Sequence, residues 1–327
     1  MPILRWIAAA AMIVALGAPA HAQAPGNFPT RHVTMIVPYP PGGPTDTYAR
    51  LVAEAMSRNL GQQVIVENIG GAGGTIGTGK AAAAAPDGYT LLLHQVGLPI
   101  GAALYKNLAY DVTRDLAGVG LINYGPALLI GRKDLPANNF AELLKWMQAP
   151  GRQVKFAHAG VGSLAHFCGL LLMDAVKVKA DQIPYRGGGP ALNDVIAGHV
   201  DLNCASLVAG DQVRSGAIKA FAVSSKERAK SLPDVPSFVE AGYPGLEINS
   251  WHALYTRAGA PPAVLARLNA ALKAALADAK VASTFERTGV MLYPVAQQTP
   301  EAAMDMLVSE IKRWGEVIRA NNIAPPG

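Results

Sequence analysis

Short apolar runs alternate with helix-like patterns along most of the chain. The runs have the length and β-branched content of buried strands, and glycine or proline stands at almost every boundary. They predict strands over residues 33–37, 64–67, 89–94, 127–130, 154–157, 200–204 and 218–223. Helices are predicted between them over residues 77–85, 140–148, 163–176 and 190–197, the last with proline at its first position. This alternation is typical of an α/β fold with largely parallel sheets.

The last third of the chain has a different pattern. An irregular stretch rich in proline follows the run at 218–223, and a strand is predicted over residues 251–256. Two long amphipathic helices are then predicted over 262–277 and 300–320. No internal repeat or low-complexity linker separates the halves, so we expect two α/β domains that are joined by ordered strands.

A strand, a glycine turn and a helix follow one another over residues 33–50. Proline cannot donate ladder hydrogen bonds, so residues 38–43 end the strand. We expect Thr45 to be the N-cap of the helix and Asp46 to lie in its first turn. Gly42 and Gly43 let a ligand approach the backbone, and the unpaired amides of the first turn favour a carboxylate or phosphate. An ordinary connection explains this segment equally well when it is taken alone.

Two further segments repeat this design. Residues 154–168 contain Gly160, Gly162 and Ser163 as an expected N-cap, and residues 181–192 contain three glycines before Pro190. In parallel sheets all three loops lie at the carboxyl ends of strands, where open α/β folds place ligands. With the first loop in one domain and the others in the second, they predict a small-molecule site in the cleft between the domains.

The amino terminus has the features of a secretory signal peptide. Residues 1–22 combine an early Arg5, an apolar stretch and the small-residue ending Ala20-His21-Ala22. The apolar stretch is short for a membrane span, and no later run reaches the ~20 apolar residues that a spanning helix needs. We therefore expect an exported, periplasmic protein that is cleaved near Ala22.

Charge and cysteine content narrow the class further. The formal net charge is +5, and the basic residues are scattered among acids rather than clustered with aromatic residues, so nucleic acid is not expected as a partner. Cys168 and Cys204 both lie in apolar segments, where a disulfide and buried free thiols are both compatible with the sequence. The histidines show no metal-ligand spacing, and no metal is expected.

Two patterns suggest enzymes but lack a decisive part. Residues 74–81 nearly match a phosphate-binding P-loop, but Ala81 stands where serine or threonine would hold Mg²⁺. Ser163 or Cys168 could be paired with His158 or His166 as nucleophile and base, but such a site also needs an orienting third group. We expect no catalytic residue and no cofactor, with an exported hydrolase that uses Ser163 as the less favoured alternative.

A set of motifs in one order covers essentially the whole chain after the signal peptide. It comprises residues 38–50, 70–77, 86–90, 159–166, 184–187, 190–191, 198–201, 232–236, 240–242 and 250–251. In these motifs the chain resembles the substrate-binding proteins of tripartite tricarboxylate transporters, the Bug family. The resemblance implies an α/β, two-domain periplasmic-binding-protein fold of type II-like organisation. Each domain would be a mostly parallel sheet flanked by helices, with the ligand in the interdomain cleft.

The resemblance also implies a domain division and a ligand. We expect a first domain over residues 26–124, a second over 125–249 and a return segment with the C-terminal helices over 250–327. A small organic carboxylate would be held mainly by backbone and small polar groups. Carried onto this chain, the ligand-binding residues are Tyr39, Pro40, Gly42, Gly43, Thr45 and Asp46 on one side and Gly162, Ser163, Ala165, His166, Tyr185, Arg186 and Gly187 on the other.

Three of these assignments carry specific expectations. Because a carboxylate would repel a bound carboxylate, Asp46 is expected to accept amide hydrogens at the helix start and shape the loop. Arg186 could pair with a second carboxylate or hold its own loop to a neighbouring acid. Gln95 and Ser206 could bind a second polar end of the ligand, with Val96 beside an apolar middle, although plain packing is equally compatible for each.

The resemblance implies the following function. The chain would be a monomeric, exported receptor that captures an aliphatic or aromatic mono- or dicarboxylate and delivers it to the membrane permease subunits of a tripartite transporter. A sensory receptor that passes the bound state to a signalling partner is the alternative.

Overall fold

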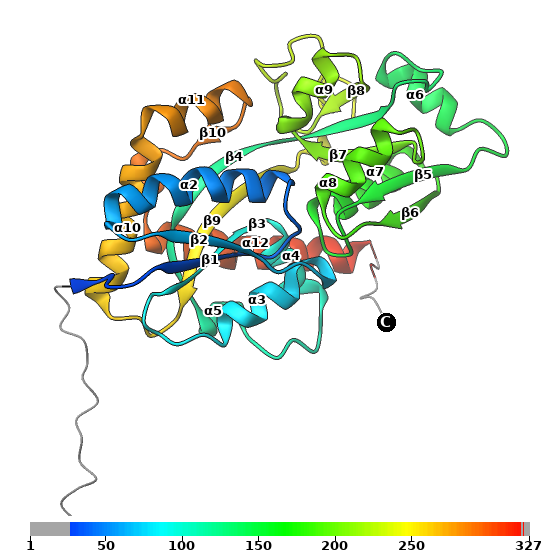
Figure 1. Cartoon of the computed structure of the whole chain (residues 1–327). Coiled ribbons are helices and arrows are strands. Elements are labelled where there is room, and N and C mark those ends of the chain that lie inside the picture. Colours follow the sequence, from blue (N-terminus) through cyan, green and yellow to red (C-terminus); the bar gives the residue numbers. More distant parts are fainter. Residues whose placement is uncertain (1–26, 322, 324–327) are drawn as a thin grey trace, which may run out of the picture.

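The computed structural model describes residues 27–321 and 323, and the predicted signal peptide lies outside them (Figure 1). The strands are β1 (Val33–Val37), β2 (Val64–Asn68), β3 (Thr90–Gln95), β4 (Leu116–Arg132), β5 (Val154–His158), β6 (Ala180–Pro184), β7 (Leu202–Ser206), β8 (Ile218–Val223), β9 (Asn249–Arg257) and β10 (Met291–Leu292). The α-helices are α2 (Pro44–Leu60), α3 (Thr75–Ala82), α4 (Gly97–Leu104), α5 (Val112–Asp115), α6 (Phe140–Met147), α7 (Leu164–Val176), α8 (Gly188–Ile196), α9 (Gly210–Arg214), α10 (Pro262–Ala277), α11 (Ala279–Arg287) and α12 (Pro300–Ala320). Short 3₁₀ helices are η3 (Ala72–Gly74), η4 (Leu207–Ala209), η5 (Pro244–Leu246) and η6 (Val295–Gln297).

The strands join in the order β2-β1-β3-β9-β4-β7-β5-β6, and β8 and β10 also pair with β4. The outer strands are parallel, as predicted: β2, β1 and β3 at one end, and β7, β5 and β6 at the other. The middle differs from the prediction, because β9 and β4 pair antiparallel with their neighbours. The chain runs out along β4 and returns along β9, so these two strands must have opposite directions.

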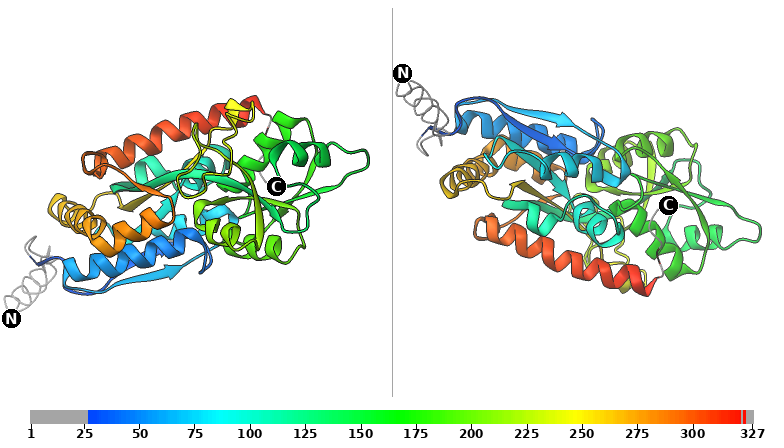
Figure 2. Two further views of the ribbon diagram at one scale, coloured as in Figure 1. Left: turned by 90° about the horizontal axis from the view of Figure 1, so that it is seen from above. Right: turned by 90° about the horizontal axis from the view of Figure 1, so that it is seen from below.

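Strand β4 divides the molecule into two lobes. Its residues 116–126 pair with β9, whereas residues 127–131 pair with β7. We call the part that pairs around β1, β2, β3, β9 and β10 lobe 1 and the part around β5–β8 lobe 2; both are visible in Figure 2, with α12 along lobe 1. Ser224 links the two chain segments that pass between the lobes, at β4 and just before β9. Its Oγ accepts the Ala127 amide at 2.7 Å and donates to the Ile248 carbonyl. The finer division at residues 124/125 and 249/250 stays a prediction.

Helix α2 shows how the sequence places the first glycine turn. Ala49, Val52, Ala53 and Met56 are buried, as their helical spacing predicts. The prediction that Thr45 is the N-cap is wrong. Pro44 occupies the first helical position, and the amide of Thr47 closes the turn onto the carbonyl of Gly43, so Gly43 is the N-cap.

Helix α8 departs from the prediction in the same way. It begins at Gly188 with Gly187 as N-cap, so Pro190 is its third residue rather than its first. Helices α10 and α12 have the predicted bounds. Helix α4 and the first half of β4 lie outside the predicted elements, because both are rich in glycine and largely buried and show neither helical nor strand periodicity.

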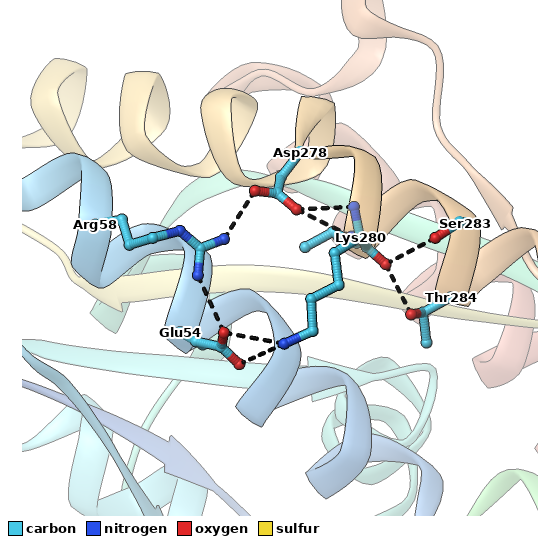
Figure 3. A network of polar contacts seen from close by, with 7 residues as sticks. Glu54, Arg58, Asp278, Lys280, Ser283 and Thr284 are labelled. Carbon is cyan, nitrogen blue, oxygen red and sulfur yellow. Dashed lines mark hydrogen bonds and ion pairs between the residues drawn. The ribbon is translucent and has the colours of Figure 1, made fainter.

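An ionic network holds the far half of α2 in lobe 1 (Figure 3). Arg58 of α2 contacts Asp278 between α10 and α11 at 2.8 Å, and Lys280 of α11 contacts Glu54 of α2 at 3.1 Å. The same Glu54 also pairs with Arg58 at 3.1 Å. Arg58, Glu54 and Lys280 are exposed and Asp278 is half-buried, so the network orients α2 more than it stabilises the fold. No helix in the described part of the chain is long and apolar enough to span a membrane.

Candidate functional site

The three predicted loops meet at the boundary between the lobes. They follow β1, β5 and β6 and lead into α2, α7 and α8, whose amino-terminal ends lie near the junction of the lobes in Figure 1. A cavity of about 190 Å³ lies among them. Its lining consists of Tyr39, Gly42, Gly43, Pro44, Thr45, Thr47, Gln95, Ala159, Ser163, Leu164, Ala165, Gly188, Gly189, Leu192, Asn203, Cys204, Ala205, Ser206, Val208, Ala209, Gln212, Ser250 and His252.

Unpaired backbone amides surround this cavity. Within the described residues, no hydrogen bond uses the amides of Thr45 in α2, Leu164 and Ala165 in α7, or Gly188 and Gly189 in α8. The first-turn amides of a helix lack partners within the helix and carry its positive dipole end. Three helices that present such ends to one cavity form a site suited to an anion.

Ser163 is the N-cap of α7, as predicted. Its Oγ accepts the amide of His166 at 3.2 Å, and the residue is only 1% exposed. The hydroxyl keeps its own hydrogen, because the N-cap bond uses the oxygen as acceptor. Ser163 can therefore fix the start of α7 and still donate to a ligand in the cavity.

Asp46 shapes the first loop and does not line the cavity. Its carboxylate accepts the Gly42 amide at 2.9 Å, Asn68 Nδ2 at 2.9 Å and Arg50 Nε at 3.0 Å. Burial alone would raise the pKa of this carboxyl, but the hydrogen bonds from Arg50, Gly42 and Asn68 together lower it. The expectation that Asp46 accepts amide hydrogens beside the helix start is confirmed.

Tyr39 and Gln95 line the cavity and bind each other. Gln95 Nε2 donates to Tyr39 Oη at 2.7 Å, and Gln95 Oε1 accepts the amide of Gly97 at 3.0 Å. Burial raises the pKa of Tyr39, so its phenol stays neutral, and Oη donates to the carbonyl of Gly73 at 3.4 Å. Gln95 thus orients Tyr39.

His252 lines the cavity and lies outside the predicted site. Its Nε2 is 3.2 Å from Thr45 Oγ1, and its Nδ1 is 2.9 Å from Asn123 Oδ1. Burial, together with the nearby His94, lowers its pKa to about 3, so the imidazole is neutral. The sequence signal for His252 was indirect, because this residue directly follows the motif at 250–251. Thr45 is 207 residues away in the sequence, so only the fold brings the Thr45 and His252 side chains together.

The predicted ligand residues fall into two groups. The structure brings Tyr39, Gly42, Gly43, Thr45, Gln95, Ser163, Ala165 and Ser206 to the cavity. It does not place Pro40, Asp46, Val96, Gly162, His166, Tyr185, Arg186 or Gly187 in its lining.

Several residues of the second group lie close by. Tyr185 and Arg186 line a neighbouring hollow with the glycine loop 70–74, and Tyr185 Oη donates to Asp194 Oδ2 at 2.5 Å. Val96 is fully buried, and His166 Nδ1 accepts the amide of Gly162 at 3.4 Å. Asn203, Gly188 and Gly189 are cavity residues outside the predicted set.

Loops of the two lobes touch beside the cavity, mainly around the neighbouring hollow. Tyr105 Oη, at the end of α4 in lobe 1, donates to the carbonyl of Val161 in lobe 2 at 3.3 Å. A Cβ on Gly187 would lie 2.9 Å from Pro40 Cδ, and one on Gly73 would collide with the carbonyl oxygen of Val161. The two lobes are therefore closed on each other in this structure.

The nucleophile and base pairs considered above are not formed among the described residues. Cys168 of α7 forms a disulfide with Cys204 of β7, with their Cα atoms 6.2 Å apart, so the thiol nucleophile considered above does not exist. Within the described residues, the Ser163 side chain bonds to no histidine ring. His158 and His166 pack with ring centroids 4.6 Å apart, and burial lowers the pKa of both, that of His166 to about 4.

Two other candidate sites from the sequence are the near P-loop and a metal site. Lys80, the lysine of the near P-loop, contacts Glu67 at 2.6 Å. The described residues contain no group of three histidine, cysteine or acidic side chains that could hold a metal ion.

Comparison with known proteins assigns the family. Residues 48–323 match the tripartite tricarboxylate transporter family receptor. A UPF0065 protein of Agrobacterium vitis is 43% identical over 94% of this chain and 90% of its own length. The structure of the periplasmic binding protein BugD is 38% identical, with a TM-score of 0.88 over 91% of this chain and 99% of that one.

A solved complex gives a second structural match. MatC from Rhodopseudomonas palustris with bound malate is 37% identical, with a TM-score of 0.86 over 89% of this chain and all of that one. These matches confirm the predicted α/β periplasmic-binding-protein fold.

Proposed function

This chain belongs to the tripartite tricarboxylate transporter receptor family, and we propose on that premise that it binds a small organic carboxylate in the cavity between its lobes. The observation that carries the proposal is the convergence of three helix amino termini, α2, α7 and α8, on one cavity. Unpaired amides and helix dipoles favour a negative group there. The malate complex of MatC supports a carboxylate as that group.

Closure of the lobes would complete the site. The amides of α2 come from lobe 1, whereas those of α7 and α8 come from lobe 2. A ligand that binds both sets stabilises the closed arrangement over an open one, since the open state lacks half of the contacts. Binding would therefore be coupled to closure.

The closed complex would then be the signal for transport. We propose that a periplasmic monomer presents it to the membrane subunits of a tripartite transporter and performs no chemistry on the ligand. The family membership supports this role.

Isothermal titration calorimetry against aliphatic and aromatic mono- and dicarboxylates tests the proposal. We expect saturable binding of at least one of them with one site per chain. Failure of every carboxylate at millimolar concentration would contradict the proposal.

The Ser163→Ala variant tests the location of the site. We expect its affinity to fall by about 1 kcal/mol, or roughly fivefold, because one hydrogen bond to the ligand is lost. Ser309→Ala is the matched control, since Ser309 is an exposed hydroxyl on α12. Equal affinity of Ser163→Ala and the wild type would remove Ser163 from the site.

A further inference from the structure

One histidine side chain is part of the cavity lining. His252 belongs to β9 and is buried. The described lining residues include no lysine, arginine, aspartate or glutamate. His252 is therefore the one side chain among them that can become a cation.

Both ring nitrogens of His252 face oxygen atoms. Nδ1 lies 2.9 Å from Asn123 Oδ1, and Nε2 lies 3.2 Å from Thr45 Oγ1. An amide oxygen can only accept a hydrogen bond, so Nδ1 carries a hydrogen and donates it to Asn123. In a neutral imidazole the other nitrogen is then an acceptor, and the Thr45 hydroxyl donates to Nε2.

The direction of this hydrogen bond determines what Thr45 offers to a ligand. While its hydrogen points at Nε2, the Thr45 hydroxyl presents only lone pairs to the cavity, beside its own backbone amide, which no described residue uses. A carboxylate on that amide would meet an oxygen that has no hydrogen to donate.

A proton on Nε2 reverses the bond. Nε2 then donates to Thr45 Oγ1, and the hydroxyl hydrogen becomes free to bind a carboxylate. The imidazolium is satisfied on both nitrogens by Asn123 and Thr45, with no change in the positions of the heavy atoms. The cavity therefore holds a ready place for a cation one hydrogen bond away from the ligand.

The groups packed around His252 leave this proton to the ligand. From α2, the ring of Tyr48 lies 5.0 Å away between centroids, and burial raises the pKa of its phenol, so it is neutral. The Asp46 carboxylate of α2 is bound to Arg50 instead. From β3, burial lowers the pKa of His94 to about 3, and β4 contributes the uncharged Asn123.

No described carboxylate bonds to either nitrogen of His252. Burial and the nearby His94 lower its pKa to about 3, so the ring is neutral at ordinary pH. A negative charge that enters the cavity favours the protonated ring, because opposite charges at close range raise the pKa of a base.

We propose that His252 takes up a proton from solvent when a carboxylate enters the cavity, and that the Thr45 hydroxyl then donates a hydrogen bond to that carboxylate. The inference rests on the proposed function and adds a pair of residues that makes ligand affinity depend on pH. His252 acts on the ligand through Thr45 and is a positioning residue.

Calorimetry at several pH values tests the inference. The probes are malate and adipate, followed by the other acids of the panel above. Each is titrated between pH 8 and 5.5 in pairs of buffers that contain no carboxylate and differ in ionisation enthalpy, such as MES and Bis-Tris. The dependence of the observed heat on the buffer gives the number of protons that are taken up on binding.

We expect proton uptake to rise towards one per ligand as the pH falls, and the affinity to increase by up to about tenfold per pH unit. His252→Gln has a polar side chain that does not titrate, and it should lose this uptake. Thr45→Val retains the backbone amide but lacks the hydroxyl, so it should lose the uptake as well, because Nε2 would have no acceptor.

His94→Gln is the matched control. The pKa of His94 is also lowered to about 3 by burial, but this residue lies outside the cavity lining. It should retain the proton uptake of the wild type. Any protonation of the ligand's own carboxyl groups is the same for every variant and cancels in the comparison.

The outcomes are separable. Binding with the same proton uptake in the wild type and His252→Gln would overturn the inference and leave the proposed function standing. Full uptake in Thr45→Val would overturn the role of its hydroxyl, and this variant supplies the comparison if His252→Gln fails to fold. Absence of binding by every acid would overturn the proposed function and the inference together.

Discussion

At the scale of single residues, polar side chains around the cavity are held in place by one another. Gln95 fixes Tyr39, and Asn123 fixes His252, which in turn contacts Thr45. A ligand therefore meets groups that have already lost their rotational freedom, and that part of the entropy cost of binding is reduced. An exception is Gln212, whose buried Oε1 has no hydrogen-bond partner among the described residues.

Four buried histidines make stability depend on pH. Burial is the first cause that lowers the pKa of His94 and His252 to about 3, that of His166 to about 4 and that of His158 below its usual value. An unfolded histidine titrates near 6.5, so below that pH the unfolded chain binds protons that the folded chain does not. The contribution of each group is fully present above pH 6.5 and is lost as the pH falls towards the folded pKa.

Urea unfolding between pH 7.5 and 5 measures this effect. The free energy of unfolding is expected to fall with acidity by up to about 1.4 kcal/mol per pH unit for each histidine. His94→Gln should reduce the slope by one histidine's share, whereas His32→Gln, a change at an exposed position, should keep it. The same slope in wild type and His94→Gln would contradict this account.

Local rules predicted some site residues and missed others. Ser163 was predicted as the N-cap because its role depends on the three residues that follow it. His252 and Asn203 were missed, because they reach the cavity from strands whose neighbours are far away in the sequence. Thr45 is a cavity residue, as predicted, but its hydroxyl pairs with His252 rather than capping α2.

At the scale of elements, the disulfide joins two parts of the cavity wall. Cys204 of β7 lines the cavity, and Cys168 lies one turn into α7, whose first residues also line it. The sequence favoured the free thiols over the disulfide, because it does not provide the 6.2 Å separation of the Cα atoms.

Removal of the disulfide should lower stability markedly. The bond is closed over a sequence separation of 36 residues, and the loss of this constraint on the unfolded chain costs about 3–4 kcal/mol. Urea unfolding of a Cys168→Ala and Cys204→Ala double variant should show that loss, and a reductant should reproduce it in the wild type but leave the variant unchanged. Equal free energies of unfolding for the oxidised wild type and the double variant would contradict this expectation.

Element prediction succeeded where one face of an element is buried. Helices α10 and α12 have solvent on one side, and their apolar stripes give their bounds correctly. Helix α4 and residues 116–126 of β4 are buried on most sides, so no polar face marks their period. The antiparallel middle of the sheet depends on the path of the chain between lobes, which local patterns do not contain.

At the scale of the whole molecule, glycine permits the lobes to close. Gly73 in lobe 1 lies so near the carbonyl oxygen of Val161 in lobe 2 that a Cβ would collide with it. We expect Gly73→Ala to hold the lobes apart and to weaken carboxylate binding at least tenfold. In the presence of ligand, small-angle scattering should show a larger radius of gyration for Gly73→Ala than for the wild type.

Gly61→Ala is the matched control for this variant. Both glycines have positive φ, +66° for Gly73 and +73° for Gly61, so both substitutions strain the backbone by about 1 kcal/mol. A Cβ on Gly61 meets nothing within 4 Å, however, and this control should bind ligand normally. Equal affinities of the two variants would show that closure does not need the Gly73 contact.

The central claim is that a carboxylate sits between the lobes on the amino termini of α2, α7 and α8. The most direct test is a crystal structure of the protein purified from its host, with the electron density of any retained ligand. We expect a carboxylate group within hydrogen-bond distance of the amides of Thr45, Ala165 or Gly189. A bound ligand without a carboxylate, or one that lies outside the cavity between the lobes, would contradict the account.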